Sequence, residues 1–165
     1  MLRTALLYGA GAGALCALWL IGLYLVGNNP YGPKRLMAIF IPPIAVLLGQ
    51  WKLRQYYKPE GPGILKAIGT GLLTTLIAAV VSAGSVYVFA QVTGPEPIAR
   101  HVAEMRQLLE AGKPMFLKEK NGRQQYEQTY RGLAQTPQDL AADDYKNKLL
   151  FGLLMSIPGG IFLRK

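Results

Sequence analysis

The side chains that most often carry out chemistry are scarce in this sequence of 165 residues. It has one histidine, His101, and one cysteine, Cys16. Zinc sites need three or four histidine, cysteine or carboxylate ligands, so the usual sets with several histidines cannot be assembled within one chain. We expect His101 to be a solvated residue on a helix surface, with a pH-sensitive contact to a partner as the alternative. Cys16 lies in an apolar segment, where its expected role is packing.

Three aspartates, Asp139, Asp143 and Asp144, form the only acidic cluster. Carboxylate oxygens are the ligands that Ca²⁺ and Mg²⁺ prefer, so a site for a divalent cation is one interpretation. The other is that the aspartates lie in the first turns of a helix, where the helix dipole stabilises negative charge. We favour the second interpretation, and we therefore predict no metal site and no cofactor.

Hydroxyl side chains are frequent in the apolar segments, but none is paired with a base. They are Thr70, Thr74, Thr75, Ser82, Ser85 and Ser156. In membrane helices such hydroxyls usually bond to a carbonyl one turn back or to a neighbouring helix. Gly9, Gly11 and Ala14 match the dinucleotide-binding pattern G-x-G-x-x-G/A, but no acidic residue follows at the required spacing, because the first one is Glu60. We predict a protein without catalytic residues and without enzymatic activity.

These residues must be positioned by long apolar segments. Between Lys66 and Glu96 the chain has no charged side chain, and about 20 apolar residues suffice for a helix to cross a bilayer. The sequence predicts an all-α membrane fold, a bundle of four transmembrane helices with an amphipathic helical extracytoplasmic insert between helices 3 and 4. It forms a single membrane domain over residues 1–165, with spans at about 4–27, 36–52, 66–92 and 147–163 and a polar insert at 93–146.

Two details follow from the composition of these spans. Residues 4–27 exceed the roughly 7 to 15 apolar residues of a signal peptide, so we predict a retained helix. The predicted span interiors hold no ionisable residue, which argues against proton relays and charge-coupled pumping. Pro42 and Pro43 predict a break near Ile41, because proline removes a backbone donor and disfavours helical geometry in the preceding residue.

Small residues recur at every fourth position in the first and third predicted spans. In lipid, small residues four apart let two helices approach closely. We therefore predict that these spans pack against each other along two ridges, Ala5, Gly9, Gly13 and Ala17 on the first and Ala67, Gly71, Thr75 and Ala79 on the third.

The polar insert begins with an amphipathic helical pattern over residues 97–111. Gly112 and Pro114 predict the end of this helix. Another helix start is predicted by an N-cap, a first-turn proline and an acidic third position at Thr136, Pro137 and Asp139. The insert is too small to bury a core alone, so it should lie on the membrane surface or against another protein. Its predicted contact surface consists of Ile98, Val102, Met105 and Leu109.

The net charge of +9 does not predict nucleic-acid binding, because the basic residues flank the apolar segments. With cytoplasmic N- and C-termini, the outer loop holds only Lys34 and Arg35. The cytoplasmic side then holds seven basic residues, Arg3, Lys52, Arg54, Lys58, Lys66, Arg164 and Lys165. We expect this orientation in a multi-pass protein. The expected partners are membrane lipid and either further copies of the chain or a larger membrane complex, but not nucleic acid.

Two stretches resemble a known family. They are LGQWKLRQYYKPEGPGILKAIGTG, with Gly49, Lys52, Arg54, Gly63, Ala67 and Gly71, and the tail TPQDLAADDYKNKLLFGLLMSIPGGIFLRK. Both resemble small bacterial four-span membrane proteins of the family called domain of unknown function 4199. The resemblance implies the architecture and a bacterial cytoplasmic (inner) membrane, but it implies no activity and no catalytic residue. The Pro-Pro pair in the second span and the PGG sequence in the last depart from the family pattern.

The sequence thus favours a non-enzymatic membrane protein, a scaffold or accessory subunit whose extracytoplasmic insert contacts partners. The alternative is an oligomeric carrier or channel for a small solute. That alternative would use the breaks at Pro42, Pro43, Pro158 and Gly159, since broken helices can mark a binding site near the membrane midplane.

Overall fold

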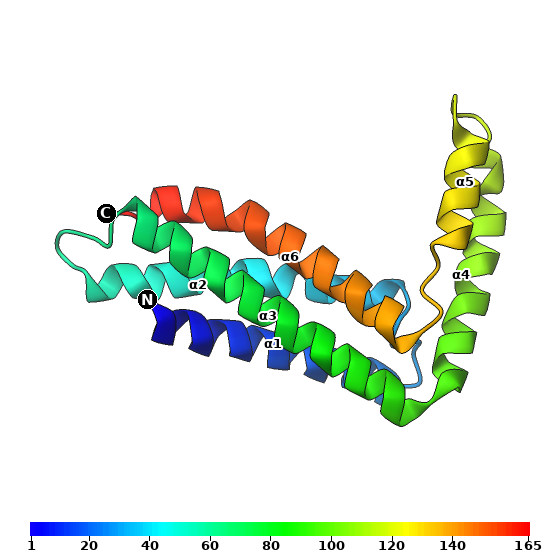
Figure 1. The fold of residues 1–165 in the computed structure, drawn as a ribbon, viewed down its shortest axis with the longest axis horizontal. Coiled ribbons are helices and arrows are strands. Elements are labelled where there is room, and N and C mark those ends of the chain that lie inside the picture. Colours follow the sequence, from blue (N-terminus) through cyan, green and yellow to red (C-terminus); the bar gives the residue numbers. More distant parts are fainter.

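A computed structural model describes residues 1–165 and is entirely helical. Its helices, in chain order, are α1 (Leu2–Leu25), the 3₁₀-helix η1 (Pro33–Phe40), α2 (Ile41–Tyr56), α3 (Ile64–Thr93), α4 (Pro95–Phe116), α5 (Gly122–Arg131) and α6 (Pro137–Phe162). The predicted all-α class is therefore confirmed. Four of the helices, α1, α2, α3 and α6, lie side by side and form what we call the body (Figure 1).

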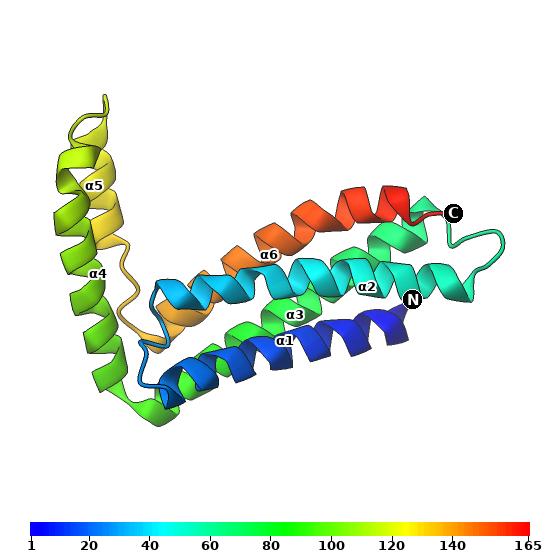
Figure 2. The same ribbon diagram turned by 180° about the vertical axis from the view of Figure 1, so that it is seen from behind.

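Within the body, α3 packs on α1, α2 and α6. The two chain termini lie at one end of the body, and α4 and α5 lie at the other (Figures 1 and 2). The loop between α2 and α3 shares the end with the termini, because the Gly63 amide donates a hydrogen bond of 3.1 Å to the Arg164 carbonyl. The termini and the α2–α3 loop thus lie at one end of the body, and α4 and α5 lie at the opposite end (Figure 1).

Three helical stretches are long and apolar enough to cross a membrane: Leu2–Leu25, Pro33–Tyr56 and Ile64–Thr93. This length and composition identify a membrane protein. The fourth predicted span lies within α6, which already begins at Pro137 in polar sequence and runs to Phe162 without a break. The helix therefore continues through Pro158, where the sequence predicts a weakened turn.

The predicted break near Ile41 is confirmed as a change of helix type. The 3₁₀-helix η1 ends at Phe40, and α2 begins at Ile41. Pro42 and Pro43 lie in the first turn of α2, where a backbone N–H would have no partner within the helix. The prolines therefore start a helix instead of interrupting one.

The chain leaves the body at Gly94, between α3 and α4. Its φ of +76° is a left-handed conformation that glycine adopts without strain, and Pro95 then opens α4. Helices α4 and α5 form a hairpin that projects away from the body (Figures 1 and 2). We call α4 from Ala103 onward, together with α5, the arm.

The structure extends α4 beyond the predicted end at Gly112, through Pro114 to Phe116. The physical reason is packing within the arm: the rings of Phe116 and Tyr126 meet edge to face with centroids 6.0 Å apart, and the Lys113 ammonium lies 5.3 Å from the Tyr126 ring. These contacts with α5 support the last turn of α4, and the stretch between the two predicted helices contains α5.

Candidate functional site

A buried ion pair lies inside the body, on α6. The Lys148 ammonium donates to both carboxylate oxygens of Asp144, at 2.7 and 2.8 Å. Each residue is only 4% exposed. Charged side chains are almost never buried this fully unless they are paired, because desolvation penalises an isolated charge heavily.

Ser82 of α3 completes this polar centre. Its hydroxyl donates to Asp144 at 2.7 Å and accepts a short hydrogen bond from Lys148, so it bridges both charges. The ammonium group then has three acceptor atoms for its three hydrogens. A lysine that activates a serine nucleophile must instead accept its proton. With Ser82 only 1% exposed, this geometry is that of a closed structural contact.

The polar centre corrects one expectation from the sequence, that no ionisable residue lies inside the packed helices. At 1.5 Å per residue, Ser82 lies about 16 Å along α3 from its last residue, Thr93. Asp144 and Lys148 reach this depth because α6 begins at Pro137, well before its apolar half. The predicted boundary between the insert (93–146) and the last span (147–163) assigns Asp144 to the insert and Lys148 to the first turn of the span, so it does not reveal that the two charges lie together inside the body.

The buried face of α6 has a periodicity that could have revealed the pair. Every fourth residue is buried from Leu140 onward: Leu140, Asp144, Lys148, Gly152, Ser156 and Gly160. A Cβ on Gly152 would lie 2.4 Å from the Thr75 side chain, and one on Gly160 would lie 2.5 Å from Ile68. α6 therefore runs antiparallel to α3 at very close range, with Lys148 at the height of Ser82.

The two predicted ridges of small residues do not face each other in the structure, because the glycines of the α1 ridge pack on α3 while the α3 ridge faces α6 and α2. On α1, Gly9 faces Ile77 and the Thr74 carbonyl, and Gly13 faces Val81. The predicted partner ridge on α3 lies on a different face, where Gly71 approaches Ser156 of α6 and Gln50 of α2. Of the predicted packing residues, Ala5, Gly9, Gly13, Ala67, Gly71, Thr75 and Ala79 are buried, and Ala17 is half-buried.

The α3 ridge faces α6 for a steric reason. α6 carries its own small residues, Gly152, Ser156 and Gly160, and two small-residue ridges allow closer approach than one. α1 instead places its glycines against the larger Ile77 and Val81. The contacts of Gly9, Gly13 and Gly71 thus place these glycines of the two predicted ridges against different neighbours, although α1 and α3 are in contact.

A second polar contact joins three helices near the other end of the body. The fully buried Gln50 amide of α2 donates to the carbonyls of Ala67 in α3 at 3.1 Å and Ser156 in α6 at 2.8 Å. The Ser156 hydroxyl lies 3.3 Å from that of Thr75. The Gln50 amide oxygen, however, is buried without a hydrogen-bond partner. An orphan of this kind carries a desolvation cost that the structure does not offset.

The remaining hydroxyls behave as expected for membrane helices. Thr70, Thr74 and Ser85 each donate to the carbonyl four residues earlier. Cys16 is buried and its thiol lies 3.7 Å from the Ala38 carbonyl, so it joins α1 to η1.

The acidic cluster of the sequence is dispersed over three environments. Asp139 forms a capping box with Thr136, whose hydroxyl lowers the pKa of that carboxyl. Asp144 is bound to Lys148. Asp143 lines a cavity of about 200 Å³ between η1, α4 and α6, together with Arg35 and other residues. No group of three metal-ligating side chains exists in the structure.

His101 lies at the junction where α4 leaves the body, and it is buried instead of solvated. Its ring nitrogen Nδ1 lies 3.4 Å from the Asn29 amide nitrogen, which also donates to Glu104 at 2.6 Å. Burial lowers the pKa of His101, and the Arg35 charge acts in the same direction, while Glu104 and Asp143 oppose it. The hydrogen bond from Asn29 lowers the pKa of Glu104.

The predicted contact surface lies partly inside the protein. Ile98 and Val102 are 6% and 9% exposed and belong to a hydrophobic cluster with Leu20, Tyr31, Val86, Ala90 and Leu140. These two residues hold α4 on the body and are therefore not free to face a partner. Met105 and Leu109 are half-buried. The large apolar residues that are most exposed on the arm and its tip are Leu108, Met115 and Leu117.

Comparison with known proteins identifies one family. Residues 7–165 match the family described as Protein of unknown function (DUF4199). The match covers almost the whole chain, so the chain belongs to this family and the resemblance in its sequence is confirmed. No curated protein and no solved structure matches the chain. The function must therefore be inferred from the geometry of the chain itself.

Proposed function

We propose that this chain, a member of a family whose description assigns no activity, is a non-enzymatic membrane scaffold or accessory subunit that contacts other proteins through its arm. The observation that carries this proposal is the projection of α4 and α5 away from the body (Figure 1). Only Ile98, His101 and Val102 of α4 are buried, all in its first two turns.

The arm has the composition of a surface that another protein completes. Its two helices hold each other through a few aromatic and cation–π contacts, such as Arg106 lying 5.5 Å from the Tyr130 ring. Short isolated helices are marginally stable in water, so contacts of this kind alone give little stability. Leu108 and Met115, 55% and 74% exposed, offer apolar anchors beside the half-buried Met105 and Leu109.

The polar centre supports a non-enzymatic function. Ser82 and Lys148 have the residue types of a catalytic pair, but both are enclosed and fully hydrogen-bonded. A substrate could reach them only if α3 and α6 separated. The centre is better suited to fix how α6 packs on α3. If α6 slid along α3, the charged groups would lose their contact with Ser82 and remain buried without it.

The distribution of charge supports four crossings, with α6 as the fourth, and an extracytoplasmic arm. The end of the body that holds both termini also holds the last turns of α2, with Lys52 and Arg54, and the α2–α3 loop, with Lys58. Basic residues in short loops favour the cytoplasmic side. The α1–α2 loop, with only Lys34 and Arg35, and the arm lie at the opposite end.

The test is to isolate the protein from its native membranes in a mild detergent and to measure the mass of the particle. We expect a stable complex with a second protein in fixed stoichiometry. The double substitution Leu108→Glu and Met115→Glu should release that protein without changing the thermal stability of the chain. The exposed Gln124→Glu on α5 is the matched control and should retain the complex. A monodisperse single chain, unchanged by the double substitution, would refute the proposal.

The orphaned Gln50 oxygen favours a second candidate, an oligomeric carrier or channel for a small solute. Buried polar groups without partners in membrane helices often mark a pathway. Gly71 and Gly159 approach this amide so closely, however, that the described packing leaves no room beside it. Solute flux into liposomes containing only this protein, abolished by Gln50→Leu, would support the candidate, and absence of flux would exclude it.

A further inference from the structure

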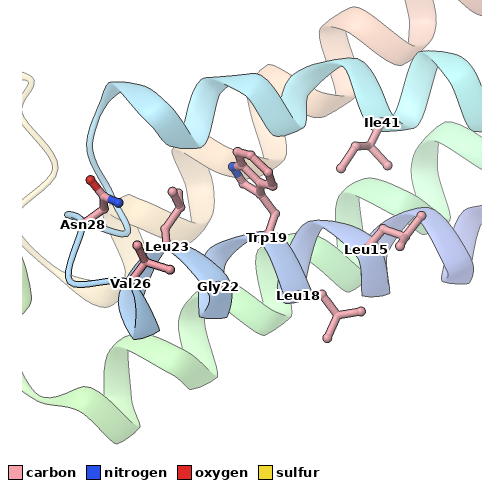
Figure 3. A pocket seen from close by; sticks show the side chains of 8 residues that line it. All are labelled: Leu15, Leu18, Trp19, Gly22, Leu23, Val26, Asn28 and Ile41. Atoms are coloured by element: carbon pink, nitrogen blue, oxygen red, sulfur yellow. The ribbon is translucent and has the colours of Figure 1, made fainter.

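A groove on the outside of the body lies between α1 and the start of α2. It has a volume of about 630 Å³, within the roughly 300–1,000 Å³ typical of ligand pockets. Trp19 extends from α1 toward η1 and α2, and Ile41 extends from α2 toward α1 (Figure 3). Leu15, Leu18 and Leu23 complete most of its apolar lining.

The groove has one polar end. Asn28 lines that end, and its side-chain oxygen accepts a hydrogen bond of 2.6 Å from the Lys34 ammonium. The indole N–H of Trp19 donates to the Lys34 carbonyl at 3.2 Å. Tryptophan with its ring in an apolar site and its N–H on a polar group is typical of the boundary between the hydrocarbon and headgroup regions. The groove therefore runs from this boundary into the apolar part of the body.

The charge at the polar end is positive. The structure has three salt bridges, and Lys34 takes part in none of them. The neighbouring Arg35 faces the separate cavity that Asp143 lines, so Lys34 is the cation of this end. A pocket that Asn28 also lines holds one acidic and one basic residue, Glu96 and Arg100, whose charges balance. A cation at the headgroup boundary attracts anionic lipid, with an effect of roughly one kcal/mol per basic residue near the surface.

We propose that this groove binds an anionic phospholipid, with an acyl chain along Leu15, Leu18 and Trp19 and the headgroup phosphate at Lys34. A lipid chain fits this shape better than a second protein helix does. Small residues at the interface favour the close approach of two membrane helices, and the groove contains only Gly22 among leucines, a tryptophan, a valine and an isoleucine. A flexible chain adapts to such an irregular apolar floor.

Two glycines of α1 provide a matched pair of test substitutions. A Cβ on Gly22, which lines the groove, would meet no atom within 4 Å, and neither would a Cβ on Gly11, which lies on α1 outside it. Leucine at position 22 therefore fills the groove without a clash at its Cβ. Gly22→Leu tests the groove, and Gly11→Leu controls for a larger apolar residue on the surface of the same helix.

The two tryptophans allow lipid contact to be measured directly. In a Trp51→Phe background, Trp19 is the only tryptophan, and its fluorescence is quenched by lipids that carry bromine on their acyl chains. The protein is placed in phosphatidylcholine vesicles that contain a low fraction of either brominated phosphatidylglycerol or brominated phosphatidylcholine. We expect the anionic lipid to compete for the site about five-fold better than the zwitterionic lipid.

The variants separate the two parts of the site. Lys34→Gln should remove the preference for the anionic lipid, Gly22→Leu should reduce quenching by both brominated lipids, and Gly11→Leu should change neither. Equal quenching of the parent protein by both lipids would overturn the proposal, as would identical behaviour of the two leucine variants. A particle mass that falls from dimer to monomer only in Gly22→Leu would assign the groove to a second copy instead. Circular dichroism verifies folding, and the exposed Lys34 side chain gives an independent result if Gly22→Leu does not fold.

Discussion

The interface between α3 and α6 and the arm formed by α4 and α5 are both helix pairs, but they are built on opposite principles. The first brings backbones together through Gly152 and Thr75 and encloses charges. The second leaves apolar side chains such as Met115 exposed. In the interface the backbones are so close that a larger side chain would collide with the facing helix, whereas in the arm most side chains are exposed to their surroundings. The difference indicates which region maintains the structure and which is available for contacts.

The largest expected effect comes from breaking the ion pair inside the α3–α6 interface. Lys148→Met leaves the Asp144 carboxylate buried without its partner, and it should cost about 3–5 kcal/mol of stability. The change is measured by chemical unfolding in detergent. The double substitution Asp144→Leu and Lys148→Met removes both charges, and it should be markedly less destabilising than Lys148→Met alone. If the two variants are equally unstable, the charge pairing is not what holds the interface.

Steric substitutions on α3 give the next largest effect. A side chain at Gly71 collides with Gln50 and Ser156, so Gly71→Leu should destabilise the protein by about 1–3 kcal/mol. Gly84 lies on the same helix with open space around it, and Gly84→Leu should change stability by no more than about 0.5 kcal/mol. Thermal unfolding in detergent compares them. Similar midpoints for the two variants would contradict the close packing of α3 on α6.

A smaller effect is expected at the junction between body and arm. His101 has a pKa lowered from 6.5 in the folded state, so the unfolded chain binds its proton more readily. The stability that the neutral ring contributes is therefore complete above pH 6.5 and decreases as the pH falls below it. Arg35 opposes protonation, while Glu104 and Asp143 favour it but do not outweigh burial.

The measurement is the unfolding midpoint of the wild type and of His101→Gln between pH 7.5 and pH 5.5. Only the wild type should lose stability over this interval. The lowered pKa of Glu104 also makes stability decrease with falling pH, but only as the pH falls through a range below 4.5, and it therefore does not interfere. An equal slope in both proteins would show that His101 is not the titrating group.

The smallest effect on stability is expected in the arm. Leu108→Gln removes an exposed apolar side chain, so the free energy of unfolding, measured by chemical unfolding in detergent, should change by no more than about 0.5 kcal/mol. A loss comparable to that of Gly71→Leu would show that the arm packs on the body, and the contrast between the two regions would disappear.

Composition and local pattern were sufficient to predict the helices of this protein. The lengths of the apolar segments predicted α1 and α3, the proline pair predicted the change of helix at Ile41, and Thr136 with Asp139 predicted the start of α6. These features depend on residues near one another in the chain, so local physical chemistry determines them. The pattern over residues 97–111 predicts an end of α4 that is too early, because the last turn of α4 is supported by the contact of Phe116 with Tyr126 of α5, which lies outside that pattern.

The pairing of the helices could not be predicted as reliably. Gly71 and Gly9 both lie on small-residue ridges, and sequence spacing alone does not determine which ridges meet. The ion pair was missed for a related reason. Asp144 and Lys148 lie in polar sequence. They become buried because the face of α6 that packs on α3 continues from Gly152 toward the start of the helix, where it meets Ser82 of α3. A search for four-residue spacing across the polar boundary would have found them.

The most direct test of this account is disulfide formation between α3 and α6. In a Cys16→Ser background, Thr75→Cys and Gly152→Cys place two thiols at the closest approach of the helices, where a Cβ on Gly152 lies 3.0 Å from that of Thr75. A small outward shift of α6 then gives the Cβ separation of roughly 3.5–4.5 Å that a disulfide needs. We predict rapid disulfide formation in this pair under mild oxidation, and none in the pair Gly9→Cys and Gly71→Cys, which places the α1 ridge on the α3 ridge. Cross-linking of the second pair and not of the first would contradict the close packing of α6 on α3.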